Sequence, residues 1–522
     1  MMRFSKQGVC WASMIVALAF LGAFSEGNDT ALVASQPKDS SSLMAWTKKV
    51  DISGYGAIEG GEIEDGHYAR LTSSPEIQHI WLGHTYAGLS VRGTVNRYFS
   101  VLVSLEGRLW YTTPLAMQRD YTTWGAPGQN FDLAIPNAEG ILTFGQKKTW
   151  DLTLNMGRFE YKYNPQAQDL GEYLFRTGCY PAYIQTTFDL PLARVSGIRL
   201  SLNLFDFLRQ DLLVTTMTDV RPFYDFSLTY LVSANVGKVF DGSIGIQFDH
   251  LFSADQNETS PKGNYSVFGY LKAPGDTAYY TFAGTKLMFR LAFDPKRFFH
   301  DAYGAVSNIT GETGGVFYAE AAVLGLENYP KSNAIDTANA TSNMYGYDDL
   351  FQKMPVMFGF NWPTHPLASY GLIPIGIALC NWDNFQRHQV LYGGAGLLSG
   401  LVAGGGTWLL EKYVKANVRL DVLSVEAEWF GARYPDSYGP DLNLTPVPAS
   451  PPADGTSGDY TRDNWKWAIY AKKTIFGGLS LIGLVGRDHL RTETYIKKDQ
   501  DYEETLIKNN QWYWMFKIKG SF

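Results

Sequence analysis

Charged side chains alternate with apolar ones along several stretches of this sequence, and they are the residues best placed to do chemistry. In 99–111, for example, Glu106 and Arg108 occupy even positions, while Val103 and Leu105 occupy odd positions. If such a stretch is a β-strand, its charged and apolar side chains lie on opposite faces. The charged set consists of Glu106, Arg108, Arg199, Asp241, Asp249, Glu426, Glu428, Lys466, Lys472, Lys517 and Lys519.

Charges of this kind around a water-filled lumen would set a field that favours or rejects ions and polar solutes. We therefore predict that the charged set lines a pore. Because it contains both signs, it suits neutral polar solutes or a weak ionic preference. The alternative is that these residues are solvated inner-wall residues, or that they pair across strands and stiffen the wall.

Catalytic and cofactor chemistry has little support. Asp488 and His489 are a carboxylate–imidazole pair, but neighbours in a strand point to opposite faces. The sequence has no Gly-x-Ser-x-Gly elbow, no Cys-x-x-Cys and no His-x-x-x-His pair, so we predict no enzyme, no cofactor and no metal site. A surface hydrolase that uses His489 or His250 ranks third among the functions considered. The net charge of −7 is mild for 522 residues and predicts no nucleic-acid partner.

Cysteines and tryptophans give weaker signals. Cys179 and Cys380 are predicted near outer strand ends in an oxidising compartment, where a disulfide is permitted, although their spacing does not show that they are close. Most tryptophans fit an interfacial aromatic belt better than a stacking track for sugars.

The elements that must position the charged set are long alternating strands. Many alternating runs reach about 10 residues, the length that a tilted strand needs to cross a bilayer. A soluble β-sandwich would show shorter strands with one face in bulk water. The pattern predicts about eighteen strands, with sixteen as the alternative, near 50–60, 77–95, 98–112, 139–146, 150–163, 180–190, 196–217, 222–235, 238–253, 278–293, 314–328, 354–362, 372–382, 406–418, 423–432, 464–475, 478–494 and 511–522.

Connections between these runs alternate in length. Short breaks at 96–97, 146–149, 191–195, 236–237 and 476–477 read as periplasmic turns, and long polar gaps at 61–76, 113–138, 164–179, 254–277, 329–353, 383–405, 433–463 and 495–510 read as outer loops. Two connections do not fit this alternation. Residues 218–221 are short where an outer loop is expected, and residues 294–313 are long where a turn is expected. The glycine-rich segment 393–406 is either a flexible surface loop or a loop folded into the barrel, where glycine permits close backbone approach.

The last strand carries the most specific pattern. The even-numbered positions of this strand include Trp512, Trp514, Phe516, Ile518 and Phe522, and the odd-numbered positions include Tyr513, Met515, Lys517 and Lys519. This aromatic strand with a terminal Phe resembles the C-terminal signature strand of bacterial outer-membrane β-barrels. The resemblance is one of architecture rather than of a specific family. It implies that the five residues form a membrane-assembly signal that the barrel-assembly machinery reads.

The amino terminus agrees with export to that membrane. Residues 1–25 read as a signal peptide, with Arg3 and Lys6 before an apolar core from Val9 to Phe24. An uncleaved membrane helix is the alternative. Residues 26–48 would form a short periplasmic segment, too short for a folded plug domain, and 49–522 the barrel. No later run of 18 apolar residues occurs, so strands must cross any membrane.

These observations predict an all-β protein, a transmembrane antiparallel β-barrel with short periplasmic turns and long outer loops in the bacterial outer membrane. The resemblance implies a porin-like channel for passive diffusion of small hydrophilic solutes. The alternative is a structural or partner-binding barrel, such as an adhesin or a subunit of an envelope complex. Expected partners are outer-membrane lipid, the barrel-assembly machinery and either a homo-oligomer or an envelope complex.

Overall fold

The computed structural model describes residues 49–67, 76–112, 131–146, 149–175, 193–205, 207–216, 226–252, 270–271, 279–280, 284–299, 302–323, 354–370, 402–414, 418–430, 465–476, 478–488, 490–496, 499–504, 506 and 511–522. The expected signal peptide 1–25, the segment 26–48, Cys179, Cys380 and the predicted strands 180–190 and 372–382 lie outside these residues. No helix among them is long and apolar enough to cross a membrane.

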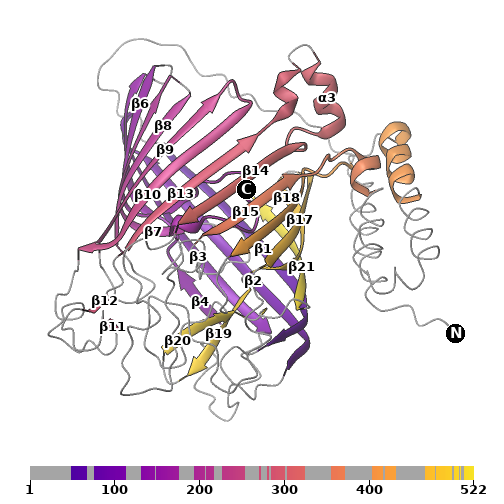
Figure 1. Cartoon of the computed structure of the whole chain (residues 1–522), viewed down its shortest axis with the longest axis horizontal. Coiled ribbons are helices and arrows are strands. Elements are labelled where there is room, and N and C mark those ends of the chain that lie inside the picture. Colours follow the sequence, from indigo (N-terminus) through magenta and orange to yellow (C-terminus); the bar gives the residue numbers. More distant parts are fainter. Residues whose placement is uncertain are drawn as a thin grey trace.

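Seventeen of the described strands form one antiparallel sheet that closes on itself (Figure 1). The last strand pairs with the first, and it also pairs with the strand that precedes it around the barrel. The sheet contains β1 (Lys49–His67), β2 (Glu76–Thr94), β3 (Phe99–Thr112), β4 (Phe131–Ala134), β5 (Ala138–Gln146), β6 (Trp150–Tyr161), β7 (Ala193–Leu204), β8 (Leu208–Thr216), β9 (Phe226–Val236), β10 (Phe240–Phe252), β13 (Gly284–Phe293), β14 (Val316–Val323), β15 (Pro355–Asn361), β16 (Val422–Phe430), β17 (Trp465–Phe476), β18 (Leu479–Arg487) and β21 (Trp512–Ser521).

These strands occupy sixteen positions around the barrel in the described part of the chain. The reason is that β4 and β5 lie end to end along β3, opposite Glu106–Leu109 and Phe99–Val103 respectively. The predicted fold class is therefore confirmed, at the lower of the two strand counts. Two small hairpins lie outside this sheet, namely β11 (Tyr270–Leu271) with β12 (Tyr279–Tyr280), and β19 (Arg491–Ile496) with β20 (Asp499–Glu504).

The alternation seen in the sequence sorts side chains between the two faces of the barrel. Large apolar residues such as Ile58, Ile244 and Phe358 are about three-fifths exposed on the outer face. Their strand neighbours Glu59 and Met357 are buried on the inner face. A closed sheet has no unpaired edge, so every strand is hydrogen-bonded on both sides while its apolar face stays outside.

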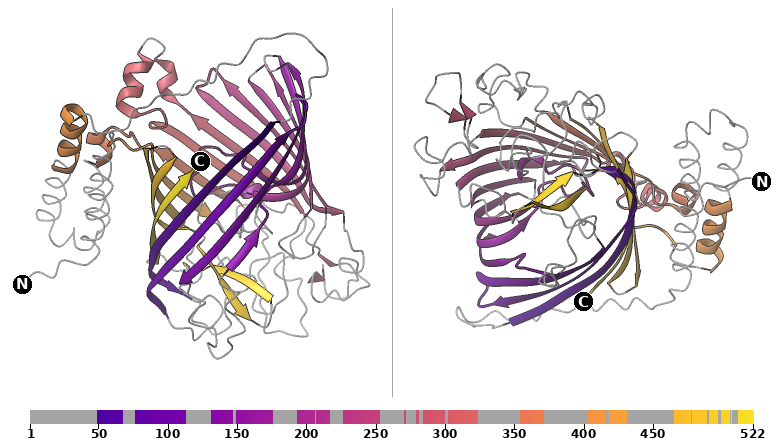
Figure 2. Two further views of the ribbon diagram at one scale, coloured as in Figure 1. Left: turned by 180° about the vertical axis from the view of Figure 1, so that it is seen from behind. Right: turned by 90° about the horizontal axis from the view of Figure 1, so that it is seen from below.

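The short connections gather at one end of the barrel, which we call the turn end. They are the turns 95–98, 205–207 and 237–239 and the break around Gly478. Both described chain ends, Lys49 and Phe522, belong to strands that begin or finish there. The opposite end, which we call the loop end, receives the other long connections and the small β11–β12 and β19–β20 hairpins, whereas the connections from β13 to β14 and from β15 to β16 are long and lie at the turn end (Figures 1 and 2).

One predicted strand is a hairpin. Residues 196–217 contain β7 and β8, joined by a turn at 205–207. Phe205 has a left-handed φ of 51° and stacks on Phe207, with ring centroids 6.4 Å apart. Two exposed aromatic residues in the turn hid it from a hydrophobicity pattern. The split also explains why the connection at 218–221 seemed to break the alternation of loop lengths. The predicted turn at 191–195 is wrong for Ala193–Val195, which begin β7.

A second predicted strand is helical. Residues 402–409 form an α-helix that continues into the π-helix η8 (Leu410–Val414), so the strand predicted at 406–418 is wrong. The consecutive apolar residues of this segment are compatible with the period of a strand and with that of a helix. Packing on the outside of the barrel favoured the helix. This segment belongs to the connection between β15 and β16 at the turn end, so the outer loop predicted at 383–405 is wrong for 402–405. These residues lie outside the barrel wall rather than in its bore (Figure 2).

The long connection expected at 294–313 is confirmed at the turn end. It contains the 3-10 helix η5 (Pro295–Phe298) and the helix α3 (Tyr303–Thr310). Asp294 caps η5, because its Oδ1 accepts a hydrogen bond from the Lys296 backbone amide at 3.1 Å.

The seam between β1 and β21 supplies a test of barrel closure. Glu59 Oε1 lies 2.6 Å from Lys517 Nζ, and both side chains are almost fully buried. Replacing Lys517 by Met leaves the Glu59 carboxylate buried without its cation, which costs about 3–5 kcal/mol. We expect K517M to lose the heat-modifiable, fast-migrating folded band at a lower urea concentration than the unmodified protein.

Two variants control this prediction. K49M removes a cation paired with Asp51 at 2.9 Å on the exposed surface, and it should cost at most about 1 kcal/mol. The double variant E59Q/K517M removes the buried charge as well and should recover part of the loss. Equal urea midpoints for K517M and K49M would contradict a role of this ion pair at the seam.

Candidate functional site

The segment that follows β6 turns into the barrel instead of extending outward. We call residues 162–175 the strap; it ends in the 3-10 helix η3 (Tyr173–Phe175). Its anchors lie on β14 and β16, which the sheet order places on the far side of the barrel from β6. The strap therefore crosses the bore, and the outer loop predicted at 164–179 is wrong for its described residues.

Glu426 on β16 holds the middle of the strap. Its Oε1 accepts a hydrogen bond from the Gln168 amide at 2.6 Å. Its Oε2 accepts from the Asp169 and Leu170 amides at 2.9 and 2.7 Å. Three backbone donors on one carboxylate resemble the way that a nest of amides binds an anion. Charge-assisted bonds of this kind contribute about 1.5–3 kcal/mol each.

Glu320 on β14 holds the second half of the strap. Its Oε1 accepts from the Tyr173 amide at 2.9 Å, and its Oε2 from the Glu172 amide at 3.0 Å and from Asn164 Nδ2 at 2.9 Å. The Tyr163 hydroxyl donates to the same carboxylate. Two wall carboxylates thus satisfy backbone amides that would otherwise be buried without partners.

The sharp bend of the strap requires glycine at position 171. Gly171 and Glu172 have left-handed φ values of 96° and 58°. A Cβ on Gly171 would lie 2.8 Å from Glu320 Oε2 and 2.9 Å from Met357 Cε. Glycine therefore allows the backbone to approach the wall closely.

Apolar contacts seal one half of the bore. Ala167, Leu170 and Tyr173 of the strap belong to a buried cluster with inward residues of β13, β14, β15, β17, β18 and β21. The Tyr173 hydroxyl also donates to Glu428 Oε2 at 2.7 Å. The anchors Glu320, Glu426 and Glu428 are at most 1% exposed, so water does not reach this side of the strap.

Ionisation of the strap is shifted by this burial. Burial, followed by the neighbouring Glu320 carboxylate, raises the pKa of Glu172 to about 8. The nearby Lys162 ammonium and the Asn164 and Tyr163 amides oppose this rise. Burial also lowers the pKa of Lys162, whose Nζ donates to the Ala167 carbonyl at 2.5 Å.

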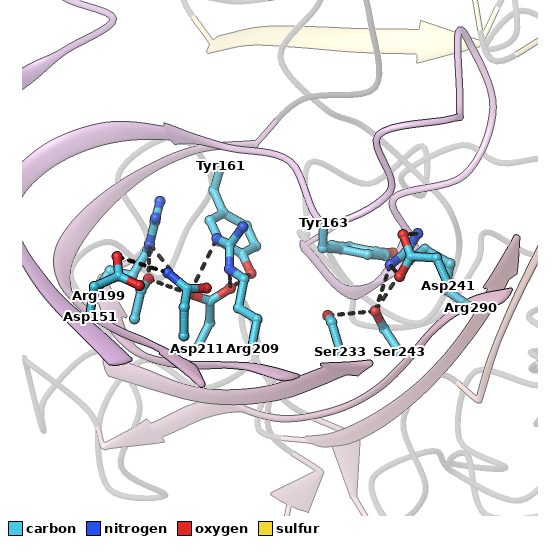
Figure 3. A network of polar contacts seen from close by, with 12 residues as sticks. Asp151, Tyr161, Tyr163, Arg199, Arg209, Asp211, Ser233, Asp241, Ser243 and Arg290 are labelled. Carbon is cyan, nitrogen blue, oxygen red and sulfur yellow. Dashed lines mark hydrogen bonds and ion pairs between the residues drawn. The ribbon is translucent and has the colours of Figure 1, made fainter. Parts of the chain in front are cut away.

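The other half of the bore has a wall of arginines paired with aspartates (Figure 3). We call Arg199, Arg209, Arg290, Asp151, Asp211 and Asp241 the arginine wall. The strand register places much of it in one row across neighbouring strands, in the order Asp151, Asn203, Arg209, Ser233, Ser243, Arg290 and then the strap anchor Glu320.

Each arginine of this wall is held by an acid. Arg290 binds both Asp241 oxygens, at 2.9 and 3.2 Å. Arg209 Nε lies 2.9 Å from Asp211 Oδ2, and Arg199 Nε lies 3.7 Å from Asp211 Oδ1. These pairs fix the guanidinium groups in position, and the near balance of charge gives the wall alternating local fields rather than one strong sign.

Solvent reaches the arginine wall at the turn end of the barrel. The side chains of Arg209, Asp241 and Arg199 are 43%, 28% and 19% exposed. Their outward neighbours Leu212 and Val214 carry the apolar outer face instead. Arg209 and Asp241 are the second residues of β8 and β10, beside the turn end. The deeper inward residues Leu213, Thr229 and Gln247 are at most 4% exposed, so the water that this wall borders lies at the turn-end mouth of the barrel.

The structure distributes the charges predicted from sequence among several sites. Arg199 and Asp241 belong to the arginine wall, while Glu426 and Glu428 anchor the strap. Glu106 is buried with Arg108, whose Nη2 lies 2.5 Å away, and with Arg194 at 3.2 Å. Lys517 is the seam residue, Lys466 donates to the Leu506 carbonyl at 2.8 Å, Lys519 lies over the Tyr55 ring at 5.1 Å, and Lys472 pairs in register with Ile482 and Val422. The Asp249 side chain lies outside the described residues.

Residues of the predicted assembly signal take the opposite face of β21 from Lys517. Trp512, Trp514 and Phe516 are partly exposed and Ile518 is exposed, whereas Tyr513, Met515 and Lys517 are buried. Trp514 packs edge-on against Trp81 of β2. Phe522 exchanges backbone hydrogen bonds with Gly54 at 2.9 and 3.0 Å. The outward row is as expected, and recognition by the assembly machinery stays a prediction.

Two further groups concern the catalytic and metal predictions. Asp488 Oδ2 accepts from the Tyr513 hydroxyl at 2.5 Å, while His489 and the side chain of His250 lie outside the described residues. His79 Nδ1 lies 3.1 Å from Glu62 Oε1 and 3.4 Å from Glu64 Oε2, a group of metal-ligand types that no sequence motif indicated. The His79 side chain is exposed, and it lies within ion-pair distance of both glutamates.

Sequence reasoning missed the strap and most of the arginine wall. Arg290 could have been found, because Lys286, Met288 and Arg290 alternate with Leu287, Phe289 and Leu291 along β13. The strap has no comparable signal. Gln168, Asp169 and Gly171 are the residues of an ordinary polar loop, and their inward course depends on carboxylates about 150–260 positions away.

No protein-family model and no curated protein matches this sequence. Among solved structures, a triple mutant of the Rhodopseudomonas blastica porin matches with a TM-score of 0.38 and 7% identity, over 91% of this chain and all of that one. Salmonella typhi OmpF in complex with daunomycin matches with a TM-score of 0.42 and 9% identity, over 91% of this chain and 98% of that one. The class that the fold and site themselves define is a large closed antiparallel β-barrel with a strap folded across its bore.

Glu172 makes the strap sensitive to pH. Because its pKa is raised to about 8 from 4.5, its contribution to holding the strap is complete below pH 4.5 and declines as the pH rises, until it is lost above pH 8. We expect a nitroxide at position 168, in a background with the native cysteines replaced by serine, to become more mobile between pH 6 and 9.5 by electron paramagnetic resonance.

The variant E172Q is neutral at every pH and should remove this mobility change. E160Q is the matched control, because Glu160 is a partly exposed wall residue paired with Arg194 at 3.2 Å. It should keep the pH profile of the unmodified strap. A profile that persists in E172Q would assign the titration to another of the facing groups, Glu320, Glu426 or Lys162, and would refute this prediction.

Proposed function

We propose that this protein is a porin-like channel of the bacterial outer membrane, through which small hydrophilic solutes diffuse passively. The observation that carries the proposal is an inward-facing wall of paired arginines and aspartates that is open to solvent at the turn-end mouth of a closed barrel. A sixteen-strand cylinder is wide enough to enclose water. The strap crosses the bore and packs against both the β14–β16 side and the β8, β9 and β13 side, so solutes would have to pass between the strap and the wall.

The outer face of the barrel supports the membrane location. A closed barrel satisfies all backbone hydrogen bonds between its strands, which hydrocarbon requires of any segment that crosses it. Exposed apolar residues such as Ile244, Phe289 and Phe358 give the surface that lipid would cover. In this orientation the turn end faces the periplasm, and β21 would be the strand that the assembly machinery reads.

The arginine wall indicates the kind of solute. Its cations and anions are interleaved at short range, so a passing solute meets both donors and acceptors without one dominant charge. Polar neutral or zwitterionic molecules and small ions of both signs fit such a path. The strap narrows the bore and would set the upper size limit.

Conductance across planar bilayers tests the channel. The unmodified protein should give steady open current. The double variant E320Q/E426Q removes the two carboxylates that hold the strap amides, and the freed strap should give a larger or noisier single-channel current. A correctly folded barrel that carries no current would refute the channel and support the scaffold or partner-binding alternative.

The control for this double variant is E139Q/E160Q. It makes the same change of charge at residues that neither anchor the strap nor belong to the arginine wall, since Glu139 binds Asn155 and Glu160 pairs with Arg194. Its conductance step should stay close to that of the unmodified protein. An equal increase in both double variants would assign the effect to charge rather than to release of the strap.

Ion preference tests the arginine wall separately. In R199Q/R209Q, Asp211 and Asp151 lose their positive neighbours, so the reversal potential in a salt gradient should shift toward cation preference. A unit charge about 4 Å from an ion is worth about 1 kcal/mol in water, which corresponds to about a five-fold change in permeability ratio. The control R97Q/K238Q removes two exposed cations from the short turns 95–98 and 237–239 at the turn end, and should leave the reversal potential unchanged. An equal shift in both variants would contradict a path along this wall.

A further inference from the structure

A compact group of segments packs against the outside of the barrel at the turn end (Figures 1 and 2). We call it the external lobe; it consists of residues 295–299, 302–313, 362–370, 402–414 and 418–421. Polar contacts join its parts, since Arg419 Nη1 donates to the Asn308 carbonyl at 2.6 Å and Arg419 Nη2 to Glu411 Oε1 at 3.1 Å. The Tyr370 hydroxyl donates to the Val418 carbonyl at 2.7 Å.

The lobe covers part of the apolar outer face. Tyr370 and Leu420 of the lobe form a buried cluster with Leu423 of β16, and Ala403, Ile469 and Ala471 pack against it. Leu423 and Ile469 point outward, because the neighbouring Ser424 and Tyr470 are inward residues. The lobe therefore occupies space that lipid fills beside the other strands.

The exposed surface of the lobe also carries large apolar residues. Val402, Leu409 and Tyr413 are 69%, 47% and 71% exposed, and their spacing of seven and four places them on one face of a helix. Phe298, Phe299 and Ile309 are more than half exposed on the parts of the lobe around η5 and α3. Soluble surfaces rarely leave so many large apolar residues together.

An aromatic ladder marks the depth of the lobe. Phe240, Phe293, Phe317 and Phe360 stack in succession across β10, β13, β14 and β15, with centroids 4.5–6.5 Å apart. Such a row at one end of the strands is typical of a membrane–water interface. Phe298 of the lobe packs against both Phe240 and Phe293, so the lobe lies at the level of the ladder.

Cations lie beside the aromatic residues of the lobe. Lys412 Nζ lies 4.8 Å from the Trp408 ring centre and 5.3 Å from that of Tyr413, and the Arg297 guanidinium lies 4.1 Å from the Tyr303 ring centre. Lysine and arginine over interfacial aromatic rings can reach phosphate groups while their apolar stems stay in the membrane.

We propose that the external lobe is a monotopic anchor that binds the phospholipid headgroup layer of the periplasmic leaflet. This inference rests on the proposed membrane location. Lipid is the favoured occupant because Phe298 joins the lobe to the aromatic ladder of the outer face, and the lobe places cations beside its aromatic rings where phosphate groups would lie. The anchor would fix the depth and tilt of the barrel at the turn end, beside β16 and β17.

Depth-dependent quenching tests the anchor. A nitrobenzoxadiazole label at L409C, in a background with the native cysteines replaced by serine, is read in vesicles of phosphatidylethanolamine and phosphatidylglycerol that contain nitroxide lipids. Interfacial helices bury their apolar face by about 5–10 Å, so a nitroxide at acyl carbon 5 should quench at least about two-fold more than one at carbon 12. A label at E312C, on an exposed polar turn of the lobe, should be quenched by neither lipid and stay accessible to iodide.

A label at V214C on the outer face of β8 separates failure of the anchor from failure of the proposed membrane location. Quenching at V214C without quenching at L409C would overturn the anchor and leave the channel standing. Self-quenching at L409C that grows with the protein-to-lipid ratio, in place of lipid quenching, would overturn it in favour of a second copy. Loss of lipid quenching at both positions would overturn the anchor together with the membrane location.

Discussion

Closure of the backbone ladder between β1 and β21 is the constraint on which the rest of this protein depends. Ten residue pairs join these strands, and Phe522 continues the pairing to Gly54. An open sheet would leave a row of unpaired amides and carbonyls at each edge. Closure removes both edges and turns the alternation of each strand into a division between the inside and the outside of the barrel. The buried Glu59–Lys517 pair lies at this seam, where a misplaced register would separate the two charges.

Because the strap runs inside the closed barrel, its backbone amides need hydrogen-bond acceptors, and the carboxylates of Glu320 and Glu426 supply them. Backbone inside a barrel has no neighbouring strand, so its amides need side-chain acceptors. Glu320 and Glu426 accept six hydrogen bonds from strap amides and the Asn164 side chain, and those bonds in turn stabilise two carboxylates that are nearly free of solvent. The part of the bore around these carboxylates is thereby packed, while Arg209 and Asp241 of the arginine wall stay exposed to solvent beside the turn end.

On the outside of the barrel, the side chains must suit lipid rather than water. Apolar residues at strand positions such as Ile244 and Phe358 are exposed where lipid would satisfy them. The external lobe covers Leu423 and Ile469, then presents Val402, Leu409 and Tyr413 in their place. The helix at 402–409 lies there because a segment outside a closed sheet must satisfy its own backbone, which a helix does and a lone strand cannot.

The sequence by itself determined the fold class, the long strands and the outward face of the last strand, because a period of two is a local property that survives in any register. It did not determine the turn at 205–207, since Phe205 and Phe207 are as apolar as the strands beside them. Only the tertiary structure decided the course of the strap and the position of the helix at 402–409. The strap depends on Glu426, 258 positions from Gln168, and these two residues meet only after sixteen strand positions have closed into one barrel. The helix depends on packing of Ala403 against the cluster of Tyr370, Leu420 and Leu423, which no local period in the sequence indicates.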